Sequence, residues 1–204
     1  MGWLDQALFR LINGWPDSWA PLFVTLSEGN KWWPVRILLL AVFVFLVSRS
    51  TERRAAILAM LAWPLSNAAT DALKAAIPFA RPSGEVASLV DQGMSIAEAV
   101  LRVGGPVLRV EPLGSMGTAS AHSANMAAIA TVFALENRKH APIWAMVALL
   151  TGISRIYVGV HYPSQVLLGM AVGVLVGFMV VHTFRAWRRV RASREEPGSP
   201  AAAS

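Results

Sequence analysis

The sequence predicts an all-α fold: a polytopic membrane helical bundle of about five transmembrane helices, preceded by a short N-terminal interfacial helix. Three observations favour this fold. Of the 204 residues, 55% are hydrophobic and only 15% are charged. The mean hydropathy is +0.49, which indicates more apolar surface than one soluble core of this size buries. The apolar residues also gather in long runs, and basic residues cluster at the ends of those runs, as beside membrane spans.

The first 30 residues are expected to lie at the membrane surface. Residues 3–13 place Trp3, Leu8 and Leu11 at helical spacing, which is typical of an amphipathic helix in the interface. A frayed terminus is the alternative. Residues 18–27 are expected to form a second helix that is too short to cross a bilayer, because a membrane helix needs about 20 residues. We expect no cleavable signal peptide, since a basic start and an unbroken apolar core are missing.

Longer apolar runs follow, and each is close to the length that crosses a bilayer. They are residues 32–48, 55–74, 121–136, 141–158 and 163–184. The first begins with Trp32 and Trp33, which suit an aromatic belt at the membrane interface. Small residues recur in the others and allow helices to pack closely. We therefore expect one domain over residues 1–194, followed by a disordered tail over residues 195–204.

The basic clusters predict the orientation of the chain. They lie at residues 49–54, 138–140 and 185–194, after the first, third and fifth runs. Five spans place all of these clusters on one side, and the positive-inside rule assigns that side to the cytoplasm. The C-terminus is then cytoplasmic, whereas the loop 75–120 and the connection 159–162 face the periplasm or the exterior. This predicts a multi-pass protein of the inner (plasma) membrane.

Three groups of polar residues fall on the outer side of this topology, although they are far apart in the sequence. They are Lys74 with Arg81, Ser120 with His122, and Ser154 with Arg155 and His161. Cations that meet at one point repel each other unless an anion lies between them, and a guanidinium matches phosphate as a bidentate fork. Ser120 starts a helix, where a hydroxyl and free backbone N–H groups form an anion site.

Two histidines at such a site can divide the chemistry of phosphoryl transfer, because their ordinary pKa lies near ~6.5. One attacks phosphorus and the other protonates the departing oxygen. Taken singly, Lys74 and Arg81 also suit snorkelling anchors, and His122 also suits a satisfied polar residue inside a bundle. Their joint arrangement favours a phosphate site.

The composition limits which cofactors and binding partners we expect. The chain has no cysteine, and no carboxylate cluster for magnesium accompanies the polar groups, so we expect neither a metal nor another cofactor. The net charge of +6 comes from clusters at the ends of apolar runs rather than from a stripe with interleaved aromatics. We therefore expect membrane lipids and a lipid phosphate as partners, and no nucleic acid.

These residues resemble the motifs of the membrane-bound type 2 phosphatidic acid phosphatase superfamily, whose pattern is Lys-x6-Arg-Pro, then Pro-Ser-Gly-His, then Ser-Arg-x5-His-x3-Asp. The first motif is intact from Lys74 to Pro82, and the third keeps Ser154, Arg155 and His161. The N-terminal stretch LFRLINGW is similar to the start of bacterial undecaprenyl-diphosphatase members.

The resemblance covers roughly residues 55–185 and implies a helical bundle that hydrolyses lipid phosphates without a metal. It implies that His161 is the nucleophile, which forms a phosphohistidine, and that His122 is the general acid. The phosphate-binding residues that it implies are Lys74, Arg81, Ser120 and Arg155.

Two motif positions depart from the family. The second motif has Ala119 in place of proline and Ala121 in place of glycine, so Ala121 adds a methyl group where the backbone approaches the phosphate. Gln165 stands where the family has aspartate, four residues after the nucleophile. A glutamine carbonyl still accepts the imidazole N–H bond but supplies no charge, so we expect a less basic nucleophile. Asp71 or Glu111 is a candidate for the missing charge.

The substrate expected from the resemblance is undecaprenyl diphosphate, which is converted to undecaprenyl phosphate for cell-wall biogenesis. Phosphatidylglycerol phosphate, phosphatidic acid and lipid A phosphate are the alternatives. A phosphotransferase with the same intermediate is a second hypothesis, and a lipid-phosphate binder or transporter impaired by Gln165 is a third. Within the loop 83–116, apolar residues suit either an amphipathic cover that admits a lipid tail or an ordinary surface helix.

Overall fold

The structure is a computed structural model that describes residues 2–112, 114 and 116–195. The all-α prediction is confirmed over this part of the chain, where the one β-type pairing is an isolated bridge between Ala80 and Met116. The helices are α1 (Trp3–Asn13), α2 (Ala20–Glu28), α3 (Trp33–Ser48), α4 (Arg53–Ala76), α5 (Gly84–Asp91), α6 (Ile96–Val103), α7 (Ala121–Glu136), α8 (Ala141–Tyr157) and α9 (Pro163–Glu195). Each expected apolar run therefore forms a helix, except for residues 32 and 158 at the ends of two runs.

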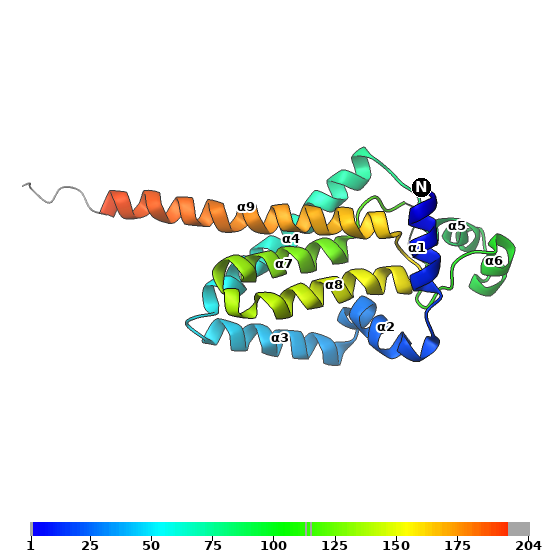
Figure 1. Cartoon of the computed structure of the whole chain (residues 1–204), viewed down its shortest axis with the longest axis horizontal. Coiled ribbons are helices and arrows are strands. Elements are labelled where there is room, and N and C mark those ends of the chain that lie inside the picture. Colours follow the sequence, from blue (N-terminus) through cyan, green and yellow to red (C-terminus); the bar gives the residue numbers. More distant parts are fainter. Residues whose placement is uncertain (1, 113, 115, 196–204) are drawn as a thin grey trace, which may run out of the picture.

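Helix α7 is the centre of the bundle and packs against α4, α8 and α9 (Figure 1). Helix α1 lies across the end at which α9 begins, and α5 and α6 lie at the same end. At the opposite end α9 extends well beyond its neighbours. We call these two ends the α1 end and the far end. The α1 end is the side that the sequence assigns to the exterior.

Glycines hold α9 against α7. Gly169 and Gly173 lie directly against the backbone of Ser120 and Ala124, and a β-carbon at either glycine would meet the carbonyl oxygen of its neighbour. Their spacing of four residues places both on one face of α9, the small-residue arrangement by which membrane helices approach closely. This contact brings the first turn of α9 beside the first turn of α7 at the α1 end.

The far end is held by buried carboxylates. Glu136, at the end of α7, pairs with Arg54 and Arg185, and Glu52 pairs with His140. Above these pairs the apolar core includes Phe133, whose ring stacks on an aromatic ring of α8 at 4.5 Å between centroids. Basic residues of three segments therefore gather at one end of the bundle, as the positive-inside argument requires of the cytoplasmic side.

The outer surface of the bundle is apolar. Helix α3 buries none of its residues, and Trp33 is 72% exposed. By length and hydropathy, α9 alone among the described helices qualifies as a span, over Pro163–Arg194. A second qualifies if Asp17–Lys31 and Trp33–Ser48, which meet at 78°, are taken together. The exposed apolar surface is that of a membrane protein, and the number of five spans stays a prediction.

Two boundaries differ from the sequence prediction. Helix α9 continues to Glu195, past the expected end of the run at 184, because helix-forming residues follow the apolar stretch. The expected disordered tail therefore does not begin at 195, and residues 196–204 lie outside the described part of the chain.

The loop 83–116 contains α5 and α6, and α6 begins with a capping box formed by Ser95 and Glu98.

Candidate active site

The candidate site lies at the α1 end, where α7 and α9 begin and where α8 ends. Ser120 is the N-cap of α7, and its hydroxyl accepts a hydrogen bond from the backbone N–H of Ser123. The backbone N–H of Ser120 donates to the carbonyl of Gln165 at 2.9 Å. The second motif is therefore tied to α9 one turn after His161.

His161 lies in the short connection between α8 and α9 and is 3% exposed. Its backbone N–H donates to the carbonyl of Arg155 at 3.2 Å, which closes the end of α8. Gly159 has a φ of +89°, a conformation that glycine adopts without strain, and this allows the chain to turn back toward α9. Pro163 then occupies the first turn of α9, as its fixed φ favours.

Gln165 sets the proton position on His161. Its Oε1 lies 3.1 Å from Nδ1 of His161 and accepts the backbone N–H of Tyr162 at 3.2 Å. Its amide nitrogen donates to the carbonyl of Ala80 at 2.9 Å, so the oxygen rather than the nitrogen faces the imidazole. Nδ1 therefore carries the proton, and the lone pair is on Nε2, the nitrogen available for attack. The amide also joins the third motif to the first.

The imidazole of His161 is kept neutral. Burial lowers its pKa well below the ordinary value, and the charges of Arg155 and Arg81 lower it further. The hydrogen bond that Nδ1 of His161 donates to Gln165 raises the pKa and is the weaker influence. At pH 7 His161 is thus the uncharged base that a nucleophile must be.

Arg81 reaches the site from the segment after α4. Its Nε donates to the carbonyl of Met116 at 2.9 Å, and burial together with the charge of Arg155 lowers its pKa. Next to this contact, the backbone N–H of Gly117 donates to the carbonyl of Phe79 at 2.7 Å. A β-carbon at Gly117 would overlap the Arg81 side chain, so glycine leaves the space that this side chain occupies.

Lys74 and His122 complete the predicted set. Lys74 lies in the last turn of α4, and its Nζ lies 2.9 Å from Oδ1 of Asp71. His122, in the first turn of α7, is half-buried and within electrostatic range of Arg155 and Lys74, and also of His161. Ala121 precedes it in the same turn. The predicted groups are therefore brought to one end of the bundle.

Arg155 is buried and holds a partner that sequence reasoning missed. Its Nη1 donates to Glu28 Oε1 at 2.7 Å and to the carbonyl of Ser27 at 3.2 Å. The expected donors of negative charge lie elsewhere: Asp71 pairs with Lys74, and Glu111 is exposed. The available signal for Glu28 was an acidic residue at the end of the mostly apolar segment 20–28, but no motif linked it to the site.

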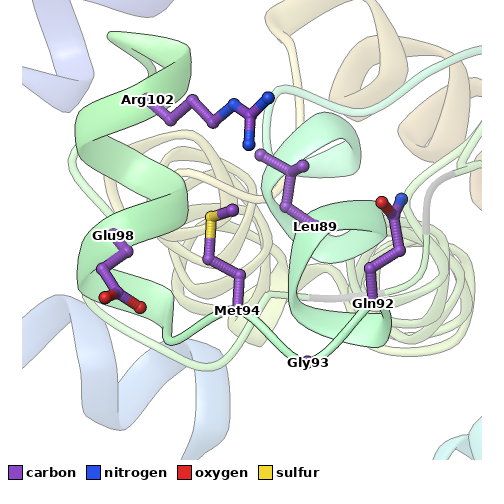
Figure 2. Close-up of a pocket in the computed structure, with 6 residues that line it drawn as sticks. All are labelled: Leu89, Gln92, Gly93, Met94, Glu98 and Arg102. Atoms are coloured by element: carbon purple, nitrogen blue, oxygen red, sulfur yellow. The ribbon is translucent and has the colours of Figure 1, made fainter.

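A separate hollow of about 570 Å³ lies between α5 and α6 (Figure 2). Leu89 and Gln92 line one side, Glu98 and Arg102 line the other, and Met94 lies between them. None of the predicted site residues lines it. We therefore do not assign the chemistry to this hollow.

The structure is a helical bundle with an apolar exterior, and at one end a buried, neutral histidine lies near the buried Arg155 and the half-buried Arg81. These features define a membrane protein with a candidate anion site. Comparison with known proteins identifies the class. The sequence profile of the PAP2 superfamily matches residues 55–189, and the chain belongs to this superfamily. The resemblance stated from the motifs is thereby confirmed.

Relatives within the superfamily act on different lipids. The chain is 39% identical over 72 residues to phosphatidylglycerophosphatase B of Bacillus subtilis, covering 30% of this chain and 36% of that protein. It is 40% identical over 60 residues to undecaprenyl-diphosphatase BcrC of the same organism, covering 29% and 31%. The chain thus spans about a third of the length of these curated relatives.

The fold has a solved counterpart. The crystal structure of Aquifex aeolicus LpxE matches with a TM-score of 0.65 and 22% sequence identity, over 88% of this chain and 95% of that one. This match covers a larger share of the chain than residues 55–189, so the shared fold extends beyond the region that the superfamily profile matches.

Proposed function

We propose that this protein is an integral membrane lipid phosphatase, which hydrolyses a phosphate or diphosphate ester of a lipid through a phosphohistidine at His161. The observation that supports this most strongly is the contact between Gln165 and Nδ1 of His161. It leaves the Nε2 lone pair for attack on phosphorus, in a region where Arg155 and Arg81 act on the same imidazole. The buried Arg155 and the half-buried Arg81 would stabilise charge on the phosphoryl oxygens.

The reaction proceeds in two steps. Nε2 of His161 forms a bond to phosphorus while the bond from phosphorus to the leaving oxygen breaks, and His122 gives its proton to that oxygen. Water then attacks phosphorus, His122 takes the proton, and the P–N bond breaks to release inorganic phosphate. Lys74, Arg81, Ser120, Arg155 and the backbone at Ala121 bind the phosphate oxygens.

Gln165 suits this mechanism in spite of its neutral side chain. It keeps the proton on Nδ1, as an aspartate would, and adds a bond to Ala80 that an aspartate has no donor to make. The missing charge leaves the imidazolium less stabilised. Binding without turnover is therefore the second candidate function, and Gln165 is the observation that favours it.

We propose undecaprenyl diphosphate as the substrate and undecaprenyl phosphate as the product. The similarity to undecaprenyl-diphosphatase BcrC supports this choice, and phosphatidylglycerophosphatase B supports a glycerophospholipid as the competing substrate. The site would face the periplasm or exterior of the inner membrane, with the C-terminus in the cytoplasm. No metal is required in this mechanism.

The test is phosphate release by the purified protein from a panel of lipid phosphates in the presence of a chelator. We expect release from undecaprenyl diphosphate, and an acid-labile phosphoryl group on the wild type that His161→Ala lacks. Full hydrolysis by His161→Ala would overturn the mechanism. Phosphate found only on a second acceptor would indicate a transferase. No release from the wild type, with release by Gln165→Asp, would indicate an impaired binder.

A further inference from the structure

A carboxylate from α2 is the feature of the site that the mechanism above leaves unused. Glu28 ends α2 and lies outside residues 55–189, which the superfamily profile matches. Its side chain is 9% exposed, and its Oε1 lies 2.7 Å from Nη1 of Arg155. Its Oε2 lies 2.5 Å from Nζ of Lys31, one turn further along the chain. A buried carboxylate is thus held between two cations, one of them in the third motif.

Arg155 is held from one side. Within the described residues its hydrogen bonds all come from Nη1, which donates to Glu28 and to the hydroxyl and carbonyl of Ser27. Its Nε is buried and has no hydrogen-bond partner among the same residues. In the guanidinium plane the Nε–H points away from Nη1, beside one N–H of Nη2. That edge is a fork that matches two oxygens of a phosphate.

We propose that Glu28 is a positioning residue for Arg155: it holds Nη1 and thereby turns the Nε edge toward the phosphate of the substrate. Lys31 holds the other oxygen of Glu28, which prevents the carboxylate from swinging onto Nε. A buried donor without a partner is rare in native proteins, and a phosphate oxygen supplies the missing acceptor. The inference rests on the proposed function, in which Arg155 binds phosphate, and in this role Glu28 acts through Arg155.

A purely structural role, in which Glu28 only docks α2 against α8, makes a different prediction. If that were its only role, replacing Glu28 would change the melting temperature but would not selectively weaken the binding of a transition-state mimic. The readout is therefore the inhibition constant for orthovanadate, which adopts the geometry of a phosphoryl group in transfer, measured with kcat and KM on the full-length protein. We expect Glu28→Ala to raise this constant and to lower kcat about 10–100-fold, with a smaller change in KM. Glu28→Gln keeps an oxygen for Nη1 and recovers part of the loss.

Two controls distinguish an effect on the orientation of Arg155 from an effect on the stability of the fold. Asp17→Asn removes a carboxylate that also pairs with an arginine, Arg109 at 2.8 Å, but Asp17 is 83% exposed and outside the site. This variant should leave the vanadate constant unchanged. In an Arg155→Lys background, Glu28→Ala should add little, because lysine has no Nε edge to aim.

An unchanged vanadate constant in Glu28→Ala, or an effect that simply adds to that of Arg155→Lys, overturns the inference. If Glu28→Ala does not fold, Glu28→Gln and Ser27→Ala replace it, and equal vanadate constants in both and the wild type overturn the inference. If the wild type hydrolyses no lipid phosphate, the proposed function fails separately. The rise in melting temperature with vanadate then tests the positioning, and a wild type that vanadate does not stabilise overturns it.

Discussion

Exchanging Gln165 for aspartate separates the two roles of this side chain. Gln165→Asp restores the residue that the family pattern has, and it places a negative charge beside His161. It also removes the amide nitrogen that donates to the carbonyl of Ala80 at 2.9 Å. The variant therefore gains an electrostatic contact and loses the link between the first and third motifs. Gln165→Asn is the matched control, since it has the same shortened side chain without the charge.

The two effects have different magnitudes and different readouts. A neutral hydrogen bond contributes about 0.5–1.5 kcal/mol, and because Ala80 is exposed, water can replace the lost donor. We expect the free energy of unfolding to fall by about 1 kcal/mol in both variants. A carboxylate near an imidazole moves its titration upward by about 1–3 pH units. The charge of Gln165→Asp should therefore move the acid limb of kcat/KM upward, whereas Gln165→Asn should not.

The assay is the pH dependence of kcat/KM for lipid phosphate hydrolysis, with thermal melting in parallel. In the wild type the low pKa of His161 predicts that the acid limb of this profile lies below the ordinary titration range of histidine. Identical acid limbs in Gln165→Asp and Gln165→Asn would refute the contact between residue 165 and the nucleophile. An acid limb near pH 6.5 or above in the wild type would refute the neutral, buried His161.

Three further predictions test other contacts. His122→Ala should lower kcat for a lipid phosphate about 10²–10⁴-fold, but much less for p-nitrophenyl phosphate, whose departing oxygen needs no proton; equal losses in these rate assays contradict the general-acid role. Gly169→Val should lower the free energy of unfolding by about 1–3 kcal/mol because its side chain meets the carbonyl of Ser120, whereas Gly2→Ala meets nothing within 4 Å and should melt like the wild type. The pKa of His161 is lower in the folded state, so the unfolded state binds the extra proton as pH falls. Stability should therefore be complete above about pH 6.5 and decrease below it. Denaturant titrations across pH should show a weaker decrease in His161→Gln, and an unchanged slope contradicts the burial of this imidazole.

The helices were predictable from the sequence because apolar runs of membrane length have few alternatives to a helix. The run 121–136 is α7 residue for residue, and the run from 163 begins at the first residue of α9. The far end of α9 was not predictable from hydropathy, since a helix continues through basic residues of good propensity after the apolar stretch ends. Whether each helix crosses a bilayer is a separate question, because several are shorter or more polar than a typical span.

The sequence could nominate candidate site residues where a motif names the side chain, but it could not predict their partners. The pattern identifies His161 and Arg155, because phosphate chemistry restricts which side chains can act there. The acceptor on Ala80 is a backbone carbonyl, which any residue supplies, so sequence carries no signal for it. The partner Glu28 is separated from Arg155 by 127 positions, and only the packing of α2 against α8 brings them together.

The first 30 residues, which the sequence predicts to lie at the membrane surface, also hold the candidate site in place. Asp5 of α1 accepts both the N–H and the hydroxyl of Ser164, at 2.9 and 2.7 Å, and so caps the start of α9. Asn13 donates to the carbonyl of Tyr157 at 2.9 Å, at the end of α8. With Glu28 on Arg155, three side chains of this segment hold the chain on both sides of His161. The proposed nucleophile, His161, belongs to the region that the superfamily profile matches, but much of what fixes its position comes from α1 and α2, before that region begins.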